Sequence, residues 1–198
     1  MKKLFIAVVI LLLSTNVYAK SVEDVLNNAM DENTWGLTTI DYEHHEIHEG
    51  DSYITSDVND VASGGWMSYL IKTPNSTKWA HCLVSIQSEG ESEFRICENP
   101  TVTANGTAMS LINRDRNSSN TATTAVYKIP SCTASGDTVI IDHWGGTAKA
   151  GVAQSGLSRA RGEFILKQNE DYLVYISNQA GGANQTAIHV ELYEHINK

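Results

Sequence analysis

The densest cluster of possible metal ligands in the sequence lies at residues 44–49, which read His-His-Glu-Ile-His-Glu. If this segment is extended, His44, Glu46 and His48 project from one face of a strand, because alternate side chains share a face. Two imidazoles and a carboxylate on one face can hold Zn²⁺ or a similar ion, with water or a distant residue as the fourth ligand. The alternative is a polar strand end whose histidines hydrogen-bond to the backbone or to a neighbouring loop. Both interpretations stay open, and we assign no metal-ligating residue.

The three cysteines are Cys82, Cys97 and Cys132. Cys82 and Cys97 fall on two predicted strands joined by a turn, so a two-residue turn would place them opposite each other, within reach of a disulfide. The apolar pattern favours another register, in which Cys82 lies beside Ile96 and Cys97 faces the other way. We therefore interpret the cysteines as small buried apolar residues, with a Cys82–Cys97 bridge as the alternative.

The remaining reactive side chains form no recognised catalytic pattern. The sequence contains no Gly-x-Ser-x-Gly elbow, and no Gly-rich phosphate loop precedes a helix. Glu89, Glu91 and Glu93 lie in or beside a predicted turn, which favours a solvated strand edge over a glycosidase pair. The charged run 114–120 predicts an ordered loop that either binds a partner or is held by Arg-to-carboxylate bonds. We predict that the protein is not an enzyme and has neither catalytic nor cofactor-binding residues.

Four tryptophans could form a platform for stacking sugar rings: Trp35, Trp66, Trp79 and Trp144. Trp144 directly precedes two glycines, so we expect it to be the most exposed of the four. The alternative, which we favour, is that the tryptophans are core aromatics at strand positions, because large aromatic side chains dominate the burial of a core.

The elements that must position these side chains are strands, because the hydrophobic pattern from Trp35 onward has a period of two. No long helical pattern interrupts them, and turn signals separate them. About ten short antiparallel strands predict an all-β fold, a jelly-roll-like β-sandwich over residues 35–198. The last strand should bury Ile188, Val190, Leu192 and Ile196, and residues 145–158 should form the longest loop. The candidate strands are residues 35–42, 52–57, 65–72, 79–87, 93–98, 107–113, 121–128, 138–144, 162–167, 171–177 and 186–195.

The N-terminal residues 1–19 have the features of a bacterial export signal. Two lysines precede an unbroken apolar run, and the segment ends in Val-Tyr-Ala, with small residues at positions −3 and −1. An apolar run this short rises only about 15 Å as a helix, roughly half the hydrocarbon thickness, so we expect a cleaved signal peptide rather than an anchor. Residues 20–34 have apolar side chains at helical spacing and predict a short amphipathic helix or linker.

The chain is acidic, with 14 Lys and Arg against 23 Asp and Glu and a formal net charge of −9. An acidic surface repels phosphate backbones, and binding them without sequence preference needs clustered Lys and Arg, which the chain lacks. We therefore expect no nucleic acid partner. A length of 198 residues is sufficient for one domain with a substantial core.

Six segments form a recognisable set, and in this order they resemble a family of tailed-phage virion structural proteins. The resemblance covers roughly residues 38–198. It implies a jelly-roll-like fold, a head-decoration or other exterior virion role, and no catalytic residues. It also implies structural roles: Pro74 and Asn75 shape a turn, Trp79 and His81 begin a core strand, and Arg114 and Arg116 order a loop. The segments are residues 44–53, 73–81, 98–107, 113–118, 166–169 with Tyr172, and 192–195.

These observations predict a non-enzymatic phage-type virion structural protein, a capsid decoration or exterior particle component on the virion surface. Its partners would be capsid or shell proteins, and it could form a homo-oligomer. The alternative is a secreted bacterial β-sandwich binding module, exported through its signal peptide to the periplasm or beyond. Such a module would bind a surface glycan or another cell-surface receptor.

Overall fold

The computed structural model describes residues 42–134, 136, 138–145, 153–155 and 162–196. These residues belong to one compact unit, Tyr42–Lys198. The predicted signal peptide (1–19), the predicted helix (20–34) and nearly all of the predicted strand 35–42 lie outside the described residues. Within the described ranges, no helix combines the length and the hydrophobicity needed to cross a membrane.

Two antiparallel sheets make up most of the described chain. From edge to edge, the first sheet contains β11 (Ala153–Ser155), β3 (Lys78–Ser88), β14 (Asn184–Ile196), β1 (Ser52–Val61) and β7 (Ile112–Asn113), and β12 (Phe164–Leu166) also pairs with β3. The second contains β10 (Thr138–Gly145), β4 (Ser92–Glu98), β13 (Asp171–Asn178), β2 (Trp66–Lys72), β8 (Ala125–Lys128) and β6 (Thr107–Met109). A small separate sheet pairs β5 (Thr101–Ala104) with β9 (Ser131–Ala134).

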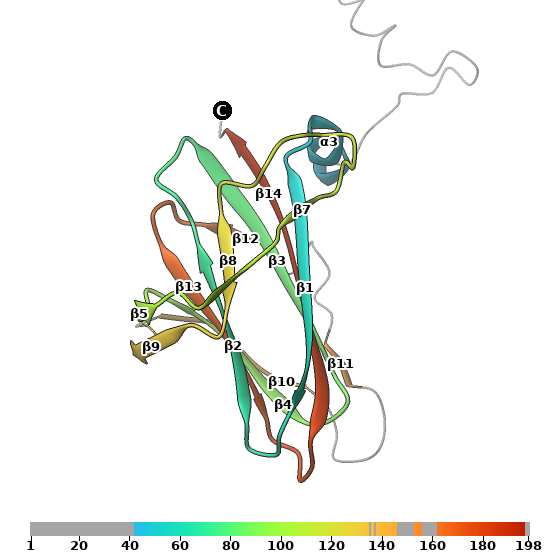
Figure 1. Ribbon diagram of the computed structural model, residues 1–198, viewed down its shortest axis with the longest axis vertical. Helices are drawn as coiled ribbons and strands as arrows, with labels where there is room; N and C mark the ends of the chain where they lie inside the picture. Colours follow the sequence, from blue (N-terminus) through green and yellow to red (C-terminus); the bar gives the residue numbers. More distant parts are fainter. Residues whose placement is uncertain (1–41, 135, 137, 146–152, 156–161, 197–198) are drawn as a thin grey trace, which may run out of the picture. The chain divides into compact units, whose positions relative to one another are not determined.

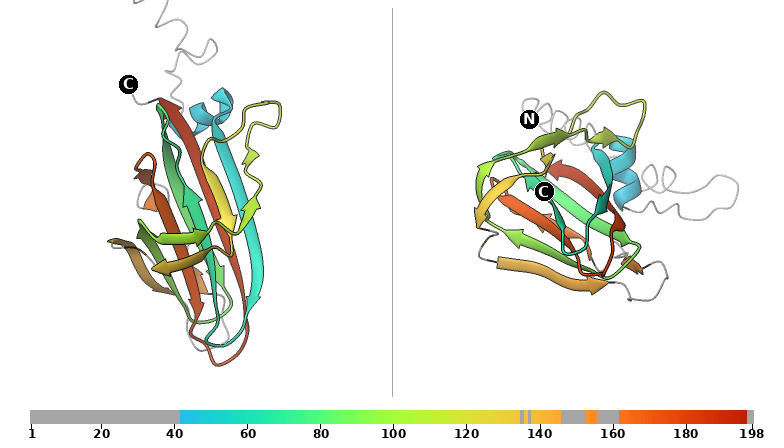
Figure 2. Two further views of the ribbon diagram at one scale, coloured as in Figure 1. Left: turned by 60° about the vertical axis from the view of Figure 1, so that its left-hand side comes forward. Right: turned by 60° about the horizontal axis from the view of Figure 1, so that its bottom comes forward.

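The chain crosses from one sheet to the other at nearly every major turn. Strands β1, β3 and β14 belong to the first sheet, while β2, β4 and β13 belong to the second. The order β11-β3-β14-β1 in one sheet and β10-β4-β13-β2 in the other is the arrangement of two Greek keys in a jelly roll. The predicted all-β, jelly-roll-like sandwich is therefore confirmed (Figures 1 and 2).

An insertion between β4 and β10, residues 99–137, carries five short strands. Its strands β6 and β8 extend the second sheet beyond β2, while β7 adds to the first sheet beside β1. The predicted single strand 107–113 is thus two strands that belong to opposite sheets. Gly106 begins this stretch with φ of 87°, and a Cβ there would collide with the backbone oxygens of Lys128 and Ile129.

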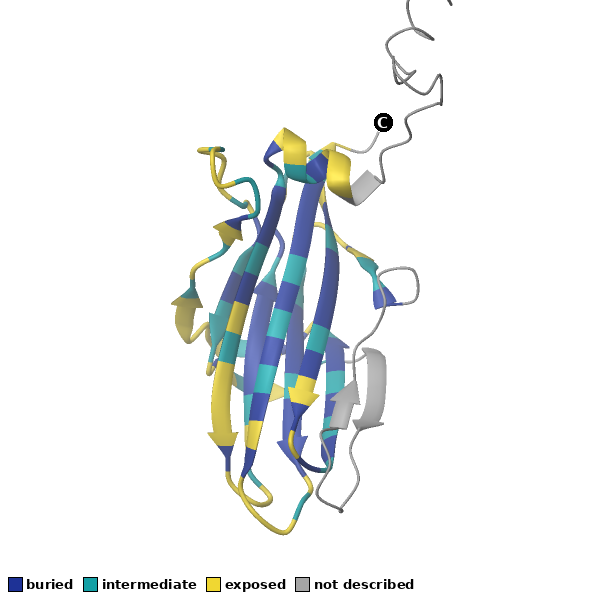
Figure 3. Ribbon diagram, turned by 90° about the vertical axis from the view of Figure 1, so that its right-hand side faces the viewer, coloured by how far each residue is buried: buried dark blue, intermediate teal, exposed yellow. Residues whose placement is uncertain are grey.

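The core lies between the two sheets and is built from alternate side chains of facing strands. Figure 3 shows buried positions alternating with more exposed ones along the strands. The predicted pairing that set Cys82 beside Ile96 is wrong, because β3 and β4 lie in opposite sheets and Cys82 pairs with Leu192 of β14. The main core residues are Tyr69, Ile71, Ala80, Cys82, Val84, Ile86, Phe94, Ile96, Val126, Leu166, Tyr172, Val174, Ile176, Ile188 and Val190.

The cysteines carry thiols, and no disulfide joins Cys82 to Cys97. Both of these side chains are buried, which confirms their interpretation as small buried residues. Cys132 lies on β9 and is only partly buried. Burial, together with the charge of Asp171, raises the pKa of the Cys132 thiol above its ordinary value.

The last strand follows the predicted alternation until its end. Ile188, Val190 and Leu192 are buried as predicted, but Ile196 is 56% exposed, so the prediction for Ile196 is wrong. The last buried position of that face is Glu194, which is 1% exposed. The predicted loop 145–158 also contains strand β11, and its other residues except Gly145 lie outside the described ranges.

Glu194 is buried because the insertion supplies donors for its carboxylate. Oε2 accepts hydrogen bonds from the backbone N–H and the hydroxyl of Thr123, both at 2.8 Å, and Oε1 accepts one from the backbone N–H of Thr124 at 2.6 Å. A buried carboxylate needs such donors to offset its lost hydration. This contact ties the end of β14 to the segment that leads into β8.

We predict that Glu194→Ala lowers the free energy of unfolding by about 3 kcal/mol, because it leaves the buried N–H of Thr124 and the partly buried N–H of Thr123 without an acceptor. Urea denaturation with circular dichroism measures this change. The matched control is Glu191→Ala on the same strand, where a partly exposed pair with Arg114 at 3.5 Å is lost and the cost should stay below about 1 kcal/mol. Equal losses in both variants would contradict the role given to Glu194.

We predict that a thiol reagent modifies Cys132 in the folded protein well before Cys82 and Cys97. The reason is access, since only Cys132 is partly exposed. Its raised pKa reduces the thiolate fraction at neutral pH, so its reaction should be slower than that of a free cysteine. Mass spectrometry of quenched samples gives the order of labelling, and early labelling of Cys82 or Cys97 would contradict the buried positions.

Candidate functional site

The histidine-rich segment is a helix, α3 (Tyr42–Glu49), and not the predicted strand end. The helix ends at Gly50, whose φ of 74° is the left-handed conformation that favours glycine. The N–H of Gly50 donates to the carbonyl of Ile47, and the N–H of Asp51 donates to the carbonyl of Glu46, both at 3.0 Å. This pair of hydrogen bonds is a Schellman motif, in which Gly50 and Asp51 follow the last turn of a helix.

The helix separates the three candidate metal ligands. His44 and His48 are four residues apart and lie on one exposed face, with their Nε2 atoms 2.9 Å apart. Glu46 is buried, on the other side of the helix. The strand geometry behind the metal hypothesis is therefore wrong, because a helix turns about 100° per residue. Among the residues that the structure describes, no group of three or more His, Cys, Asp or Glu side chains is placed to hold a metal ion.

Segments from distant parts of the sequence meet beside α3. The side-chain amide of Asn113 donates to the carbonyl of Gly50 at 2.7 Å, and Lys78 pairs with Asp51 at 2.7 Å. The N–H of Glu194 donates to the carbonyl of Asp51 at 2.9 Å. Figure 1 shows α3 and the end of β14 at the same end of the sandwich. These residues belong to four of the six segments that resemble virion proteins, and they form one bonded network, which we call the helix end.

A second set of hydrogen bonds holds the turn between β2 and β3. The Thr73 hydroxyl donates to the carbonyl of Lys167 at 2.6 Å, and the N–H of Asn169 donates to the carbonyl of Pro74 at 3.1 Å. Gln168 also donates to the carbonyl of Lys78 at 3.2 Å. These bonds fix the loop that contains Pro74.

A second polar cluster links β3 and β14 on the outer face of the first sheet. Glu163 accepts hydrogen bonds from the hydroxyl of Tyr193 at 2.7 Å and lies 2.8 Å from Nδ1 of His81. The Nε2 atoms of His81 and His195 are 2.9 Å apart, and the rings of His81 and Tyr193 stack with centroids 4.4 Å apart. Sequence reasoning missed this cluster, because only the β3–β14 register places His81 opposite Tyr193.

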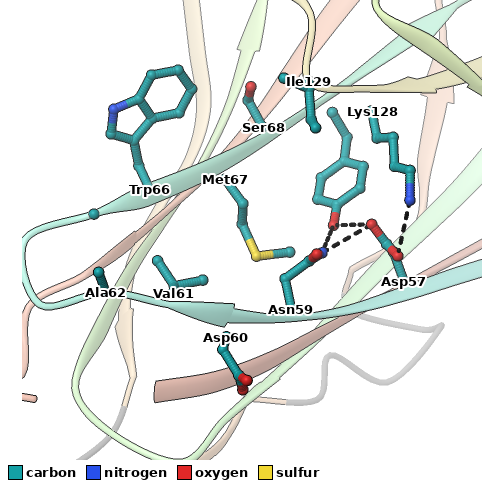
Figure 4. A pocket seen from close by; sticks show the side chains of 12 residues that line it. Asp57, Asn59, Asp60, Val61, Ala62, Trp66, Met67, Ser68, Lys128 and Ile129 are labelled. Carbon is teal, nitrogen blue, oxygen red and sulfur yellow. Dashed lines mark hydrogen bonds and ion pairs between the residues drawn. The ribbon is translucent and has the colours of Figure 1, made fainter. Parts of the chain in front are cut away.

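A groove lies at the open edge between β1 and β2 (Figure 4). Its volume is about 410 Å³. Asp57 Oδ2 accepts hydrogen bonds from the Tyr69 hydroxyl at 3.0 Å and from the Asn59 amide at 2.9 Å, while its Oδ1 lies 3.5 Å from Lys128 Nζ. A second hollow of about 380 Å³ continues the groove beyond Asp57 and Lys128 toward Ile112.

The neighbours of Asp57 favour the ionised form of its carboxyl group. Burial works against its charge, but the hydrogen bonds from Asn59 and Tyr69 and the positive charge of Lys128 outweigh it and lower the pKa of the carboxyl group below its ordinary value. Burial and the nearby Asp57 raise the pKa of Tyr69 far above its ordinary value. The groove therefore presents a fixed carboxylate held by neutral and cationic donors.

Two of the four tryptophans are exposed, so the core interpretation is wrong for them. Trp66 is 58% exposed, and Trp79 is also exposed on β3. The backbone of Trp144 pairs with Glu93, while Trp35 lies outside the described residues. The charged run is an ordered loop as predicted: Asn113 and Asp115 accept backbone N–H bonds within it, and Arg114 lies 3.5 Å from Glu191.

No protein-family model matches the chain, and no curated protein matches it. The class that the fold defines is an all-β sandwich with jelly-roll topology. The two polar clusters described above are each joined by internal hydrogen bonds.

We predict that Tyr69→Phe lowers the free energy of unfolding at pH 7 by about 1 kcal/mol, because it removes a hydrogen bond to the Asp57 carboxylate. The lowered pKa of Asp57 stabilises the fold above the ordinary carboxyl pKa, and this contribution is lost as the pH falls through the folded-state pKa. The difference between variant and parent should therefore shrink near about pH 2.

Urea denaturation at both pH values measures this difference. The matched control is Tyr127→Phe, a partly exposed tyrosine on β8, which should change the free energy of unfolding by less than about 0.5 kcal/mol at either pH. A pH-independent loss in Tyr69→Phe would mean that packing, and not the bond to Asp57, explains the effect.

Proposed function

We propose that the protein is a non-enzymatic structural component of a phage-type virion, attached to the outside of the particle. The jelly roll is a fold that capsid domains and lectins use, so it is compatible with the role but does not select it. The observation that carries the proposal is the edge of the sandwich along β1, which exposes aliphatic side chains and which we call the open edge.

The open edge has exposed aliphatic side chains beside unpaired backbone. Val58 on β1, Ile112 on β7 and Ile129 after β8 are exposed, and Ile129 reaches 73%. Ile112 and Ile129 line the two hollows of the groove. Large aliphatic side chains gathered in this way are typical of a surface that is covered in an assembly.

The backbone of β1 supports the same conclusion. Its outer edge pairs with β7 only at Tyr53 and Ile54, and within the described ranges no strand pairs with that edge further along. A segment of a shell protein could add to this edge by backbone hydrogen bonds, with its side chains in the groove. Asp57 and Lys128 would then select the partner by charge, as polar groups at interfaces do.

The resemblance to virion structural proteins is the second support. Four of the six segments that carry it contribute to the helix end, where they brace α3 and the end of β14. This leaves the open edge available for attachment to the particle. Capsid or shell proteins are the proposed partners, and a second copy of the chain is the other occupant that the test must distinguish.

The test is to purify phage particles whose genome encodes the chain and to quantify the chain in these particles by mass spectrometry. We predict that Val58→Asp and Ile129→Asp each reduce its occupancy on the particle about tenfold or more, because a charge at a buried contact is costly. The matched control is Ile165→Asp, because Ile165 is 55% exposed on β12, far from β1 in the sheet order. Its occupancy should stay unchanged.

Circular dichroism melting of each purified variant checks that the fold persists. Particles that lack the chain would overturn the proposal, and recovery of the chain from the periplasm or medium would favour the secreted binding module. A parent chain that dimerises through the open edge without binding particles would identify a second copy as the occupant.

A further inference from the structure

The outer face of the second sheet carries a pair of aromatic side chains that lies outside the core. Trp66 on β2 and Tyr175 on β13 stack with ring centroids 5.6 Å apart and planes inclined by 29°. Trp66 is 58% exposed although it belongs to a regular strand. Figure 4 shows its indole on the side of β2 opposite Met67, which packs against the core. The stacking on Tyr175 orients an aromatic face toward solvent.

A small pocket lies beside this pair. It has a volume of about 200 Å³ and is lined by Trp66, Ser68, Pro130, Cys132, Leu173 and Tyr175, among others. Its far wall is the segment around β9, which belongs to the insertion. Since a water occupies about 30 Å³ and drug-sized pockets begin near 300 Å³, the pocket has room for one small ring rather than an extended ligand.

The floor of the pocket contains a hydroxyl group without a hydrogen-bond partner. Ser68 is only 4% exposed, and its Oγ has no partner among the described residues. Buried hydroxyl groups are almost always hydrogen-bonded, and leaving one unsatisfied costs free energy. A ligand hydroxyl in the pocket would supply the missing partner.

Polar side chains flank the aromatic pair in fixed positions. Tyr175 pairs with Arg95 in the sheet, and Ser177 lies between Trp66 and Glu93 in the next row. Arg95 and Glu93 form an ion pair at 2.6 Å, and the Ser177 hydroxyl donates to Glu93 at 3.3 Å. The charges of Arg95 and Glu93 compensate each other, so the surroundings favour a neutral ligand with several hydroxyl groups.

We propose that Trp66, Tyr175 and Ser68 form a binding site for a neutral pyranose sugar of a surface glycan. A pyranose presents a flat C–H face that stacks on an aromatic ring and a rim of hydroxyl groups that bond to neighbouring polar side chains. Trp66 supplies the stacking face. Ser68 and the Arg95–Glu93 pair supply the hydrogen-bonding groups. The site differs from the possible platform of four tryptophans, in which Trp144 is the one expected to be most exposed, and it does not depend on attachment to a particle.

The test uses the purified full chain with a panel of neutral mono- and oligosaccharides, followed by ¹⁵N NMR titration with the sugars that bind. At least one should bind, with shifts at the Trp66 indole N–H and at the amides of Ser68 and Tyr175. We predict that Trp66→Ala weakens that binding about tenfold or more. Ser68→Ala should weaken it less and should raise the melting temperature of the unbound protein, because it removes an unsatisfied buried hydroxyl.

The matched control is Trp79→Ala, which removes an exposed tryptophan from the other sheet and should leave binding unchanged. Absence of binding across the panel at about 10 mM sugar, where even millimolar affinity would be detected, would overturn the proposal. Equal losses in Trp66→Ala and Trp79→Ala would also overturn it, as would shifts centred on Trp144. Since no particle is involved, failure of this test is distinguishable from failure of the virion proposal.

Discussion

The pairing of β14 with two neighbours along its length is the constraint on which the rest of the structure depends. The strand pairs with β3 from Thr186 to Ile196 and with β1 from Asn184 to Tyr193. It therefore sets the register between β3 and β1, the two strands on either side of it. At its end, Glu194 turns inward and accepts bonds from Thr123 and Thr124. One strand thus positions both the jelly roll and the insertion that crosses its edge.

The insertion between β4 and β10 creates the surfaces that the proposals use. Its strand β8 supplies Lys128 to the open-edge groove, and β9 forms the far wall of the small pocket beside Trp66. Variable function carried by connecting segments on a rigid scaffold is common, because these segments add side chains without disturbing the core. The two surfaces meet at β2, because Trp66 and Ser68 line both the open-edge groove and the small pocket.

The ionisable groups near these surfaces are satisfied by one another. Asp57 is held by Asn59, Tyr69 and Lys128, and Glu163 is shared by His81 and Tyr193. Bonds of this kind fix the orientation of the side chains that they join.

The sequence by itself determined the fold class and most strand positions, because a period-two pattern directly reports which side chains face the core. Only the tertiary structure decided which strands are neighbours. It separated β3 from β4, placed His81 opposite Tyr193 and exposed Trp66, none of which local periodicity encodes. It also made 42–49 a helix, since Gly50 ends a helix as readily as it makes a turn. Where the local sequence allows either a helix or a turn, contacts between residues distant in the chain decide which one forms. The proposed binding surfaces also consist of residues that are distant in the chain.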